Sequence, residues 1–163
     1  MTHERELFQK VSPPETHNAA KSEKIDVSDK IIWVAEDDDG LRKLDARILA
    51  ISGFTKVRTF SNGAEVLDAY QNTPENGLPD LIATDLDMPV LGGKQMIVML
   101  RDTDNPKPLL FVVKSGQITP ERVEELQALG VTQILEKPYP IKDFAETITN
   151  ALKNGHGDQP SVM

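Results

Sequence analysis

A small set of polar side chains stands where short apolar runs of the sequence end, and their types indicate joint chemistry. The set is Glu36, Asp37, Asp85, Ser115 and Lys137. Carboxylates can hold a divalent cation or attack an electrophile, and a hydroxyl beside an ammonium group can bind an anion. The set therefore predicts a site that handles an anionic group, provided that the fold brings the runs together.

Five apolar runs, rich in Val, Ile and Leu, alternate with amphipathic stretches. They are Ile31–Ala35, Lys56–Phe60, Leu81–Thr84, Leu109–Val113 and Val131–Leu135. Continuous apolar runs of this length are typical of strands buried on both faces. Five successive strand–helix units predict a parallel sheet with helices on both faces and right-handed crossovers. Ligands of such sheets bind at the carboxyl ends of the strands, where the polar set lies.

Capping signals assign several helix ends. Ser52-Gly53 is the expected end of the first helix, and Ser61 is the expected N-cap of the second. Thr119-Pro120 is a cap followed by proline at the first helical position, and Pro140 begins the last helix.

Length and charge limit the class of protein. The chain has 163 residues and a formal net charge of −8, which fits one domain (30–153) between a flexible N-terminal extension (1–29) and a flexible C-terminal tail (154–163). The acidic balance argues against a dedicated nucleic-acid binder. No apolar segment is long enough to span a membrane or resembles a secretory signal, so the expected location is cytoplasmic.

Neither cysteine nor histidine enters the candidate site. Cysteine is absent, and His3, His17 and His156 all fall in the predicted tails. This argues against thiolate chemistry, a histidine-ligated metal and a protein that phosphorylates its own histidine. The nucleophile is then a carboxylate, or Ser115 with Lys137 as its base.

Grouping the acids at one sheet edge would place like charges close together. At an effective dielectric of ~20, two carboxylates about 4 Å apart repel by roughly 4 kcal/mol. A divalent cation is the natural compensation, and Mg²⁺, which keeps water and phosphate in its shell, fits better than Ca²⁺ or Zn²⁺. Asp38 and Asp39 are expected instead to cap the next helix and complement its dipole.

From about residue 30 to residue 153 the chain resembles the receiver domains of bacterial two-component response regulators. The resemblance rests on four motifs in order, VAEDDDGLRKL, PDLIATDLDMPVLGG, FVVKSG and ILEKPY. The intervals of 30 residues from Asp85 to Ser115 and 22 from Ser115 to Lys137 are typical of compact receivers, whereas the 48 from Asp37 to Asp85 are slightly long. The implied fold is a flavodoxin-like (βα)5 doubly wound parallel sheet with strand order 2-1-3-4-5.

The resemblance implies roles for the matched acids. Asp85 would be the phosphoacceptor, taking a phosphoryl group from a phosphohistidine on a sensor histidine kinase or a histidine phosphotransfer protein. Glu36 and Asp37 would hold Mg²⁺ directly or through water, and Asp85 and the backbone carbonyl of Asp87 would complete the protein ligands.

The resemblance also assigns the remaining polar set. Lys137 would pair with Asp85 and then with a phosphoryl oxygen, which fits the need of phosphoryl transfer for positive charge around the equatorial oxygens. Ser115 would be the switch hydroxyl that moves to bond the phosphoryl group. The bond between Lys137 and Pro138 would be cis, a geometry that proline permits.

Other positions would tune or alter the switch. Asp87, Gly116 and Gln117 lie where the family adjusts water access to the phosphoryl group. Ile134 occupies the position, three before the lysine, where the family usually has an aromatic switch residue, so that an output signal must travel differently. Gly92 stands where the loop commonly carries an acid, and it loses a possible helix cap.

The expected protein is a stand-alone, chemotaxis-type receiver without enzymatic activity beyond slow self-dephosphorylation. It would signal through protein contacts on its fourth helix, fifth strand and fifth helix, as a monomer or a weak dimer, without nucleic acid or membrane partners. Two alternatives are open. One is a receiver-like scaffold that signals without phosphorylation. The other is a haloacid-dehalogenase-type phosphatase, whose D-x-D loop the segment DLDMP resembles, although those enzymes place their metal-binding acids later in the chain.

Overall fold

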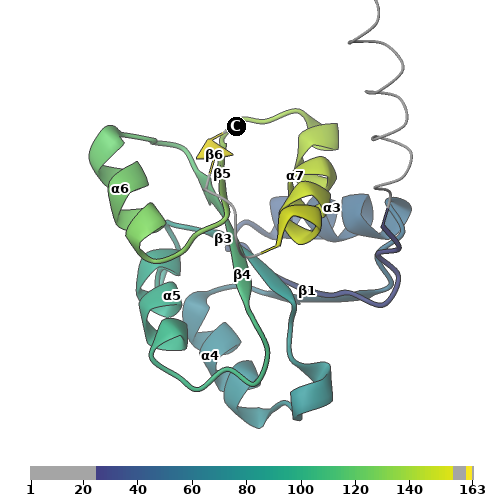
Figure 1. The fold of residues 1–163 in the computed structure, drawn as a ribbon. Helices are drawn as coiled ribbons and strands as arrows, with labels where there is room; N and C mark the ends of the chain where they lie inside the picture. The colour runs from purple at the N-terminus through teal and green to yellow at the C-terminus, as the bar shows by residue number, and fades with distance from the viewer. Residues whose placement is uncertain (1–24, 156–160, 163) are drawn as a thin grey trace, which may run out of the picture.

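The structure, a computed structural model, describes residues 25–155 and 161–162 (Figure 1). The predicted N-terminal extension up to residue 24 and residues 156–160 and 163 of the predicted tail lie outside the described residues. Residues 25–29, which were assigned to the extension, lie along the domain. Val27 packs against the core, and the hydroxyl of Thr55 donates a hydrogen bond of 2.7 Å to the carbonyl of Ser28.

Six parallel strands form one sheet in the order β2-β1-β3-β4-β5-β6. They are β1 (Ile31–Ala35), β2 (Lys56–Phe60), β3 (Leu81–Asp85), β4 (Leu110–Ser115), β5 (Gln133–Glu136) and β6 (Ser161–Val162). The first five confirm the predicted order 2-1-3-4-5 and the flavodoxin-like doubly wound fold. The two-residue β6 was not predicted; it pairs with the outer edge of β5.

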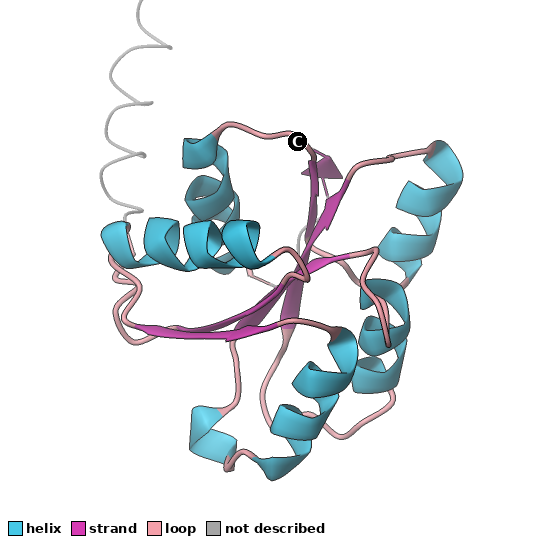
Figure 2. Cartoon of the chain, turned by 180° about the vertical axis from the view of Figure 1, so that it is seen from behind, coloured by secondary structure: helices cyan, strands magenta, loops and turns pink. Residues whose placement is uncertain are grey.

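Helices cover both faces of the sheet (Figure 2). One face carries α3 (Asp39–Ile51) and α7 (Ile141–Asn154), and the other carries α4 (Gly63–Asn72), α5 (Gly93–Arg101) and α6 (Pro120–Ala128). A short 3-10 helix, η1 (Glu75–Gly77), lies in the polar loop before β3. None of the helices within the described residues is long and apolar enough to cross a membrane.

The predicted helix starts are confirmed with one exception. Thr119 caps α6 and Pro140 directly precedes α7. The N-cap of α4 is Asn62 rather than Ser61, because the Asn62 side chain accepts the amide of Glu65 at 2.9 Å. The Glu65 carboxylate in turn accepts the amide of Ser61 at 2.8 Å, so that the two side chains satisfy free amides reciprocally.

Two apolar clusters sandwich the sheet, and strand alternation decides which residue enters which cluster. Ile32 and Val34 of β1 pack beneath α3 and α7, whereas Trp33 and Ala35 pack beneath α4, α5 and α6. We call these the α3/α7 layer and the α4–α6 layer. The same alternation continues to the carboxyl ends of the strands and fixes the layer toward which each polar side chain there points.

Candidate functional site

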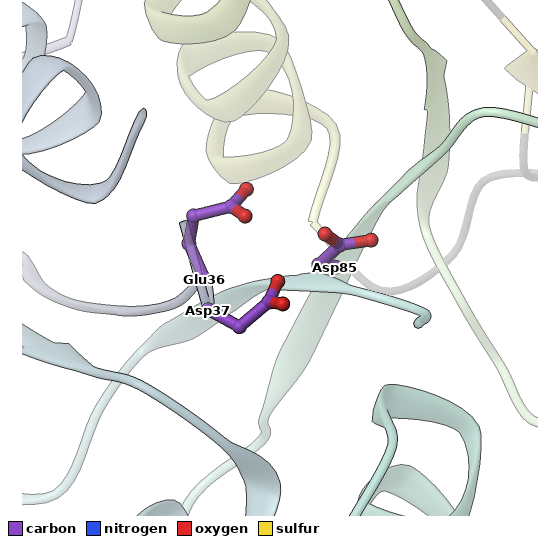
Figure 3. A group of neighbouring side chains, drawn as sticks. All are labelled: Glu36, Asp37 and Asp85. Atoms are coloured by element: carbon purple, nitrogen blue, oxygen red, sulfur yellow. The ribbon is translucent and has the colours of Figure 1, made fainter. Parts of the chain in front are cut away.

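Three carboxylates from two neighbouring strand ends meet at the carboxyl edge of the sheet (Figure 3). Glu36, Asp37 and Asp85 each offer an oxygen, and these oxygens lie within 4.8 Å of one another. The closeness follows from the pairing of β1 with β3, in which Ala35 lies opposite Thr84. Glu36 and Asp85 are buried and Asp37 is exposed. This set of hard oxygen donors, open to solvent on one side, fits a divalent cation such as Mg²⁺.

The loop after β3 holds Asp85 in place through close backbone packing. A Cβ at Gly93 would lie 2.2 Å from the carbonyl oxygen of Asp85, so that only glycine allows α5 to begin there. A Cβ at Gly92 would lie 2.9 Å from the carbonyl oxygen of Leu86, and Gly92 indeed gives α5 no side-chain cap. The amide of Asp87 donates a hydrogen bond of 3.3 Å to Asp85, and its own side chain is exposed.

Lys137, which follows β5, contacts two of the three acids. Its Nζ lies 2.7 Å from Oδ2 of Asp85 and 3.5 Å from Oε1 of Glu36. Burial alone would lower the pKa of Lys137, but the two carboxylates outweigh it and the pKa is raised. The Lys137–Pro138 peptide bond is cis.

A second lysine in the site had no role assigned in the sequence analysis. Lys114 of β4 is fully buried, and its Nζ lies 2.7 Å from Oε1 of Glu36 and 2.6 Å from Oδ2 of Asp45 in α3. The ammonium group also lies 5.5 Å from the centre of the Phe144 ring. The sequence signals were a lysine that continues an apolar strand and an aspartate on the apolar stripe of a helix. Two lysines therefore balance part of the negative charge for which the sequence analysis expected a divalent cation.

Burial and neighbouring charges lower the pKa of one buried acid of the site and raise the pKa of two others. Burial would raise the pKa of Glu36, but the two lysines and the amide of Asp38 outweigh it and the pKa is lowered. For Asp85, burial and the charge of Glu36 prevail over Lys137, and the pKa is raised. Burial, together with Glu36, likewise raises the pKa of Asp45 despite Lys114.

Ser115, the neighbour of Lys114, points into the opposite layer. Its hydroxyl donates to the carbonyl of Gln117 at 3.0 Å and accepts from the amide of Gln117 at 3.2 Å and from Arg122 of α6 at 3.3 Å. Ile134 is buried beside α6 in the α4–α6 layer. Arg122 was not singled out in the sequence analysis, since nothing local distinguishes it from a surface arginine.

The structure thus brings Glu36, Asp37, Asp85 and Lys137 together and holds Ser115 at the adjacent strand end. Gly116 and Gln117 are exposed beside it. The family model described as the response regulator receiver domain matches residues 32–149. The chain belongs to this family.

The curated relatives of this receiver are longer proteins. The transcriptional regulatory protein PrrA of Mycobacterium tuberculosis is 34% identical over 126 residues, which are 77% of this chain and 51% of that protein. The receiver chain spans about half, or less, of the length of the curated relatives that it matches.

Solved receiver structures share the fold. The receiver domain of the Francisella response regulator 1452 matches with a TM-score of 0.63 and 25% identity, covering 77% of this chain and 97% of that one. The chemotaxis response regulator CheY4 of Vibrio cholerae matches with a TM-score of 0.63 and 24% identity, covering 74% and 97%. The chain is thus a receiver domain of two-component response regulators, a class of signalling domain.

Proposed function

We propose that this receiver accepts a phosphoryl group on Asp85 from a phosphohistidine of a sensor kinase or a phosphotransfer protein, in the presence of Mg²⁺. The observation that carries the proposal is the placement of the Asp85 carboxylate. It lies between two further carboxylates and an ammonium group, with Lys137 Nζ 2.7 Å from its Oδ2. No other described aspartate combines a cation-binding cluster with a lysine partner in this way.

The residues of the chain divide the work of this transfer. A carboxylate oxygen of Asp85 attacks phosphorus, and the bond from phosphorus to the imidazole nitrogen of the donor breaks with the electron pair staying on nitrogen. Glu36 and Asp37 would hold Mg²⁺ together with Asp85 and the backbone carbonyl of Asp87, and the ion supplies positive charge to the phosphoryl oxygens. Lys137 provides a second positive charge and orients Asp85 before the attack.

Ser115 would then bond the phosphoryl group, which requires the hydroxyl to leave Gln117 and Arg122. We place the signal on the surface of α6, β5 and α7, which would contact a downstream protein partner. Asp87, Gly116 and Gln117 are exposed around the acceptor and would set the phosphate lifetime by controlling water access. The proposed output is a protein contact made by the receiver as a monomer or weak dimer in the cytoplasm.

Intact-mass spectrometry after incubation with acetyl phosphate and Mg²⁺ tests the proposal. We expect one phosphoryl adduct on the wild type, none on Asp85→Asn, and one on the matched control Asp87→Asn. An adduct on Asp85→Asn but not on Asp87→Asn would reverse the assignment.

Two further outcomes would replace the proposal with another function. Unchanged amide spectra of the strand-end residues with beryllofluoride and Mg²⁺ would favour a scaffold that signals without phosphorylation. Multiple-turnover hydrolysis of p-nitrophenyl phosphate that Asp87→Asn abolishes would favour a phosphatase.

A further inference from the structure

Lys114 places a buried ammonium group against a predicted metal ligand. The side chain is fully buried in β4, and its ion-pair partners among the described residues are Glu36 at 2.7 Å and Asp45 at 2.6 Å. A buried ammonium group needs such partners, because it has lost its water shell. Since Asp45 alone could balance its charge, the contact with Glu36 is an additional feature of this site.

Both oxygens of Glu36 already accept hydrogen bonds. Oε1 is 2.7 Å from Lys114 and 3.5 Å from Lys137, and Oε2 accepts the amide of Asp38 at 3.2 Å. A cation that took Glu36 as a direct ligand would have to share Oε1 with the two lysines or share Oε2 with the amide of Asp38, and in either position it would lie close to the Lys114 ammonium group. Lys114 is enclosed, so its ammonium group has no solvent to move into.

The charges of the site show what depends on this lysine. Glu36, Asp37, Asp45 and Asp85 carry four negative charges when ionised, and Lys114 and Lys137 carry two positive ones. The remaining charge of −2 would match one divalent cation. Replacing Lys114 and Asp45 together by neutral residues keeps this total and frees Glu36 from one of its two cations.

We propose that Lys114 is a positioning residue that holds Glu36 in place without a metal ion and weakens the binding of a divalent cation at this carboxylate. The inference rests on the proposed function, because it concerns the metal site of the phosphoacceptor. It predicts that the chain has a preformed acid pocket of reduced metal affinity, in which the tethered ammonium group and the metal ion share Glu36.

Calorimetric titration of the metal-free protein with Mg²⁺ at neutral pH tests this inference. In Lys114→Met/Asp45→Asn we expect binding tighter by about tenfold or more, because a nearby positive charge is removed from a carboxylate ligand. In Asp45→Asn alone we expect Mg²⁺ binding weaker by about threefold or more, because Glu36 is then the one remaining carboxylate of the described residues that pairs with Lys114. The matched control is Lys56→Met, which removes an exposed lysine at the far end of β2 and should change the affinity less than about twofold.

The amide of Asp38 reports on the positioning. Its proton should move upfield in the metal-free double variant, because Glu36 loses the lysine that holds it as an acceptor, and it should stay in place in Lys56→Met.

Each outcome decides the question. Equal affinities in the wild type and the double variant would overturn the role of Lys114 while leaving the proposed function intact. Absence of Mg²⁺ binding in every form would overturn the metal site of the proposed function and this inference with it. If the double variant does not fold, the Mg²⁺ affinity of Asp45→Asn tests the inference by itself. An affinity equal to or higher than that of the wild type would then overturn the inference.

Discussion

Two neighbouring residues at the end of β4 belong to different parts of the receiver. Lys114 faces the α3/α7 layer and joins the buried carboxylates of Glu36 and Asp45. Ser115 faces the α4–α6 layer, where its hydroxyl meets the backbone of Gln117 and the side chain of Arg122. Both are fully buried, and one step along the strand separates a network of buried ion pairs from an uncharged hydroxyl group.

The two sides of the strand end differ in the free energy that a rearrangement of the side chains would cost. Breaking a buried ion pair leaves an uncompensated charge and costs several kcal/mol, about 3–5 by analogy with other proteins. Exchanging one partner of a neutral hydroxyl costs about 0.5–1.5 kcal/mol. The acid side is therefore suited to hold a fixed geometry, and the serine side is suited to move when a new acceptor arrives.

The largest expected effect is on the acid side. We expect Lys114→Met to lower the free energy of unfolding by about 3–5 kcal/mol, because it leaves Glu36 and Asp45 buried without their lysine. The matched Ser115→Ala change should cost about 1.5 kcal/mol or less. Urea unfolding followed by circular dichroism measures both. Equal losses of unfolding free energy in the two variants would contradict the difference between the acid side and the serine side.

The buried Ile134 should resist the aromatic residue that the family usually carries. We expect Ile134→Tyr to cost about 1–3 kcal/mol, because the α4–α6 layer is packed around a smaller side chain. Ile134→Val, a cavity-forming control, should cost about 0.5–1.5 kcal/mol. If the Ile134→Tyr variant unfolds at the same urea concentration as the wild type, this layer has room for a rotating ring.

In the metal-free protein, ionisation of Asp85 should lower the free energy of unfolding. Its pKa is raised by burial and by Glu36, so the folded state binds its proton more tightly than the unfolded state, and stability falls as pH rises from the ordinary value of 3.8 through the raised one. We expect Asp85→Asn in EDTA to have a higher free energy of unfolding than the wild type at neutral pH, because the variant has no carboxylate to ionise in the buried site.

The gain should disappear in acid, where Asp85 of the wild type is protonated in both states. Unfolding curves at several pH values measure it. A gain of the same size at all pH values would assign the effect to packing rather than to charge.

The smallest expected effect is at Arg122. We expect Arg122→Met to change the free energy of unfolding by about 0.5 kcal/mol or less, because its bonds to Ser115 and Gln117 are partly exposed to solvent. Phosphorylation should persist, while the beryllofluoride-induced shifts of the α6 amides become smaller. If those shifts match the wild type, Arg122 does not connect Ser115 to α6.

Most of the fold could be predicted from local patterns. Continuous apolar runs gave the strands, and turn or cap residues such as Thr119 and Pro140 gave the helix starts, because both signals act over a few neighbouring residues. The Ser61 cap was wrong because Asn62 and Glu65 formed a reciprocal arrangement that the serine alone did not reveal. The strand β6 carries no apolar run and depends on the free edge of β5.

In the candidate site, too, the local features could be predicted from the sequence and the long-range contacts could not. The sequence alone was enough to place the site residues at the carboxyl ends of parallel strands, because the position of a residue at a strand end is a local property. These residues are Glu36, Asp37, Asp85, Ser115 and Lys137. Only the tertiary structure decided that Lys114 pairs with Asp45, 69 residues away, and with Glu36, 78 residues away. That pairing depends on strand order and on the face that α3 turns to the sheet, and buried charges select their partners only once those elements have packed.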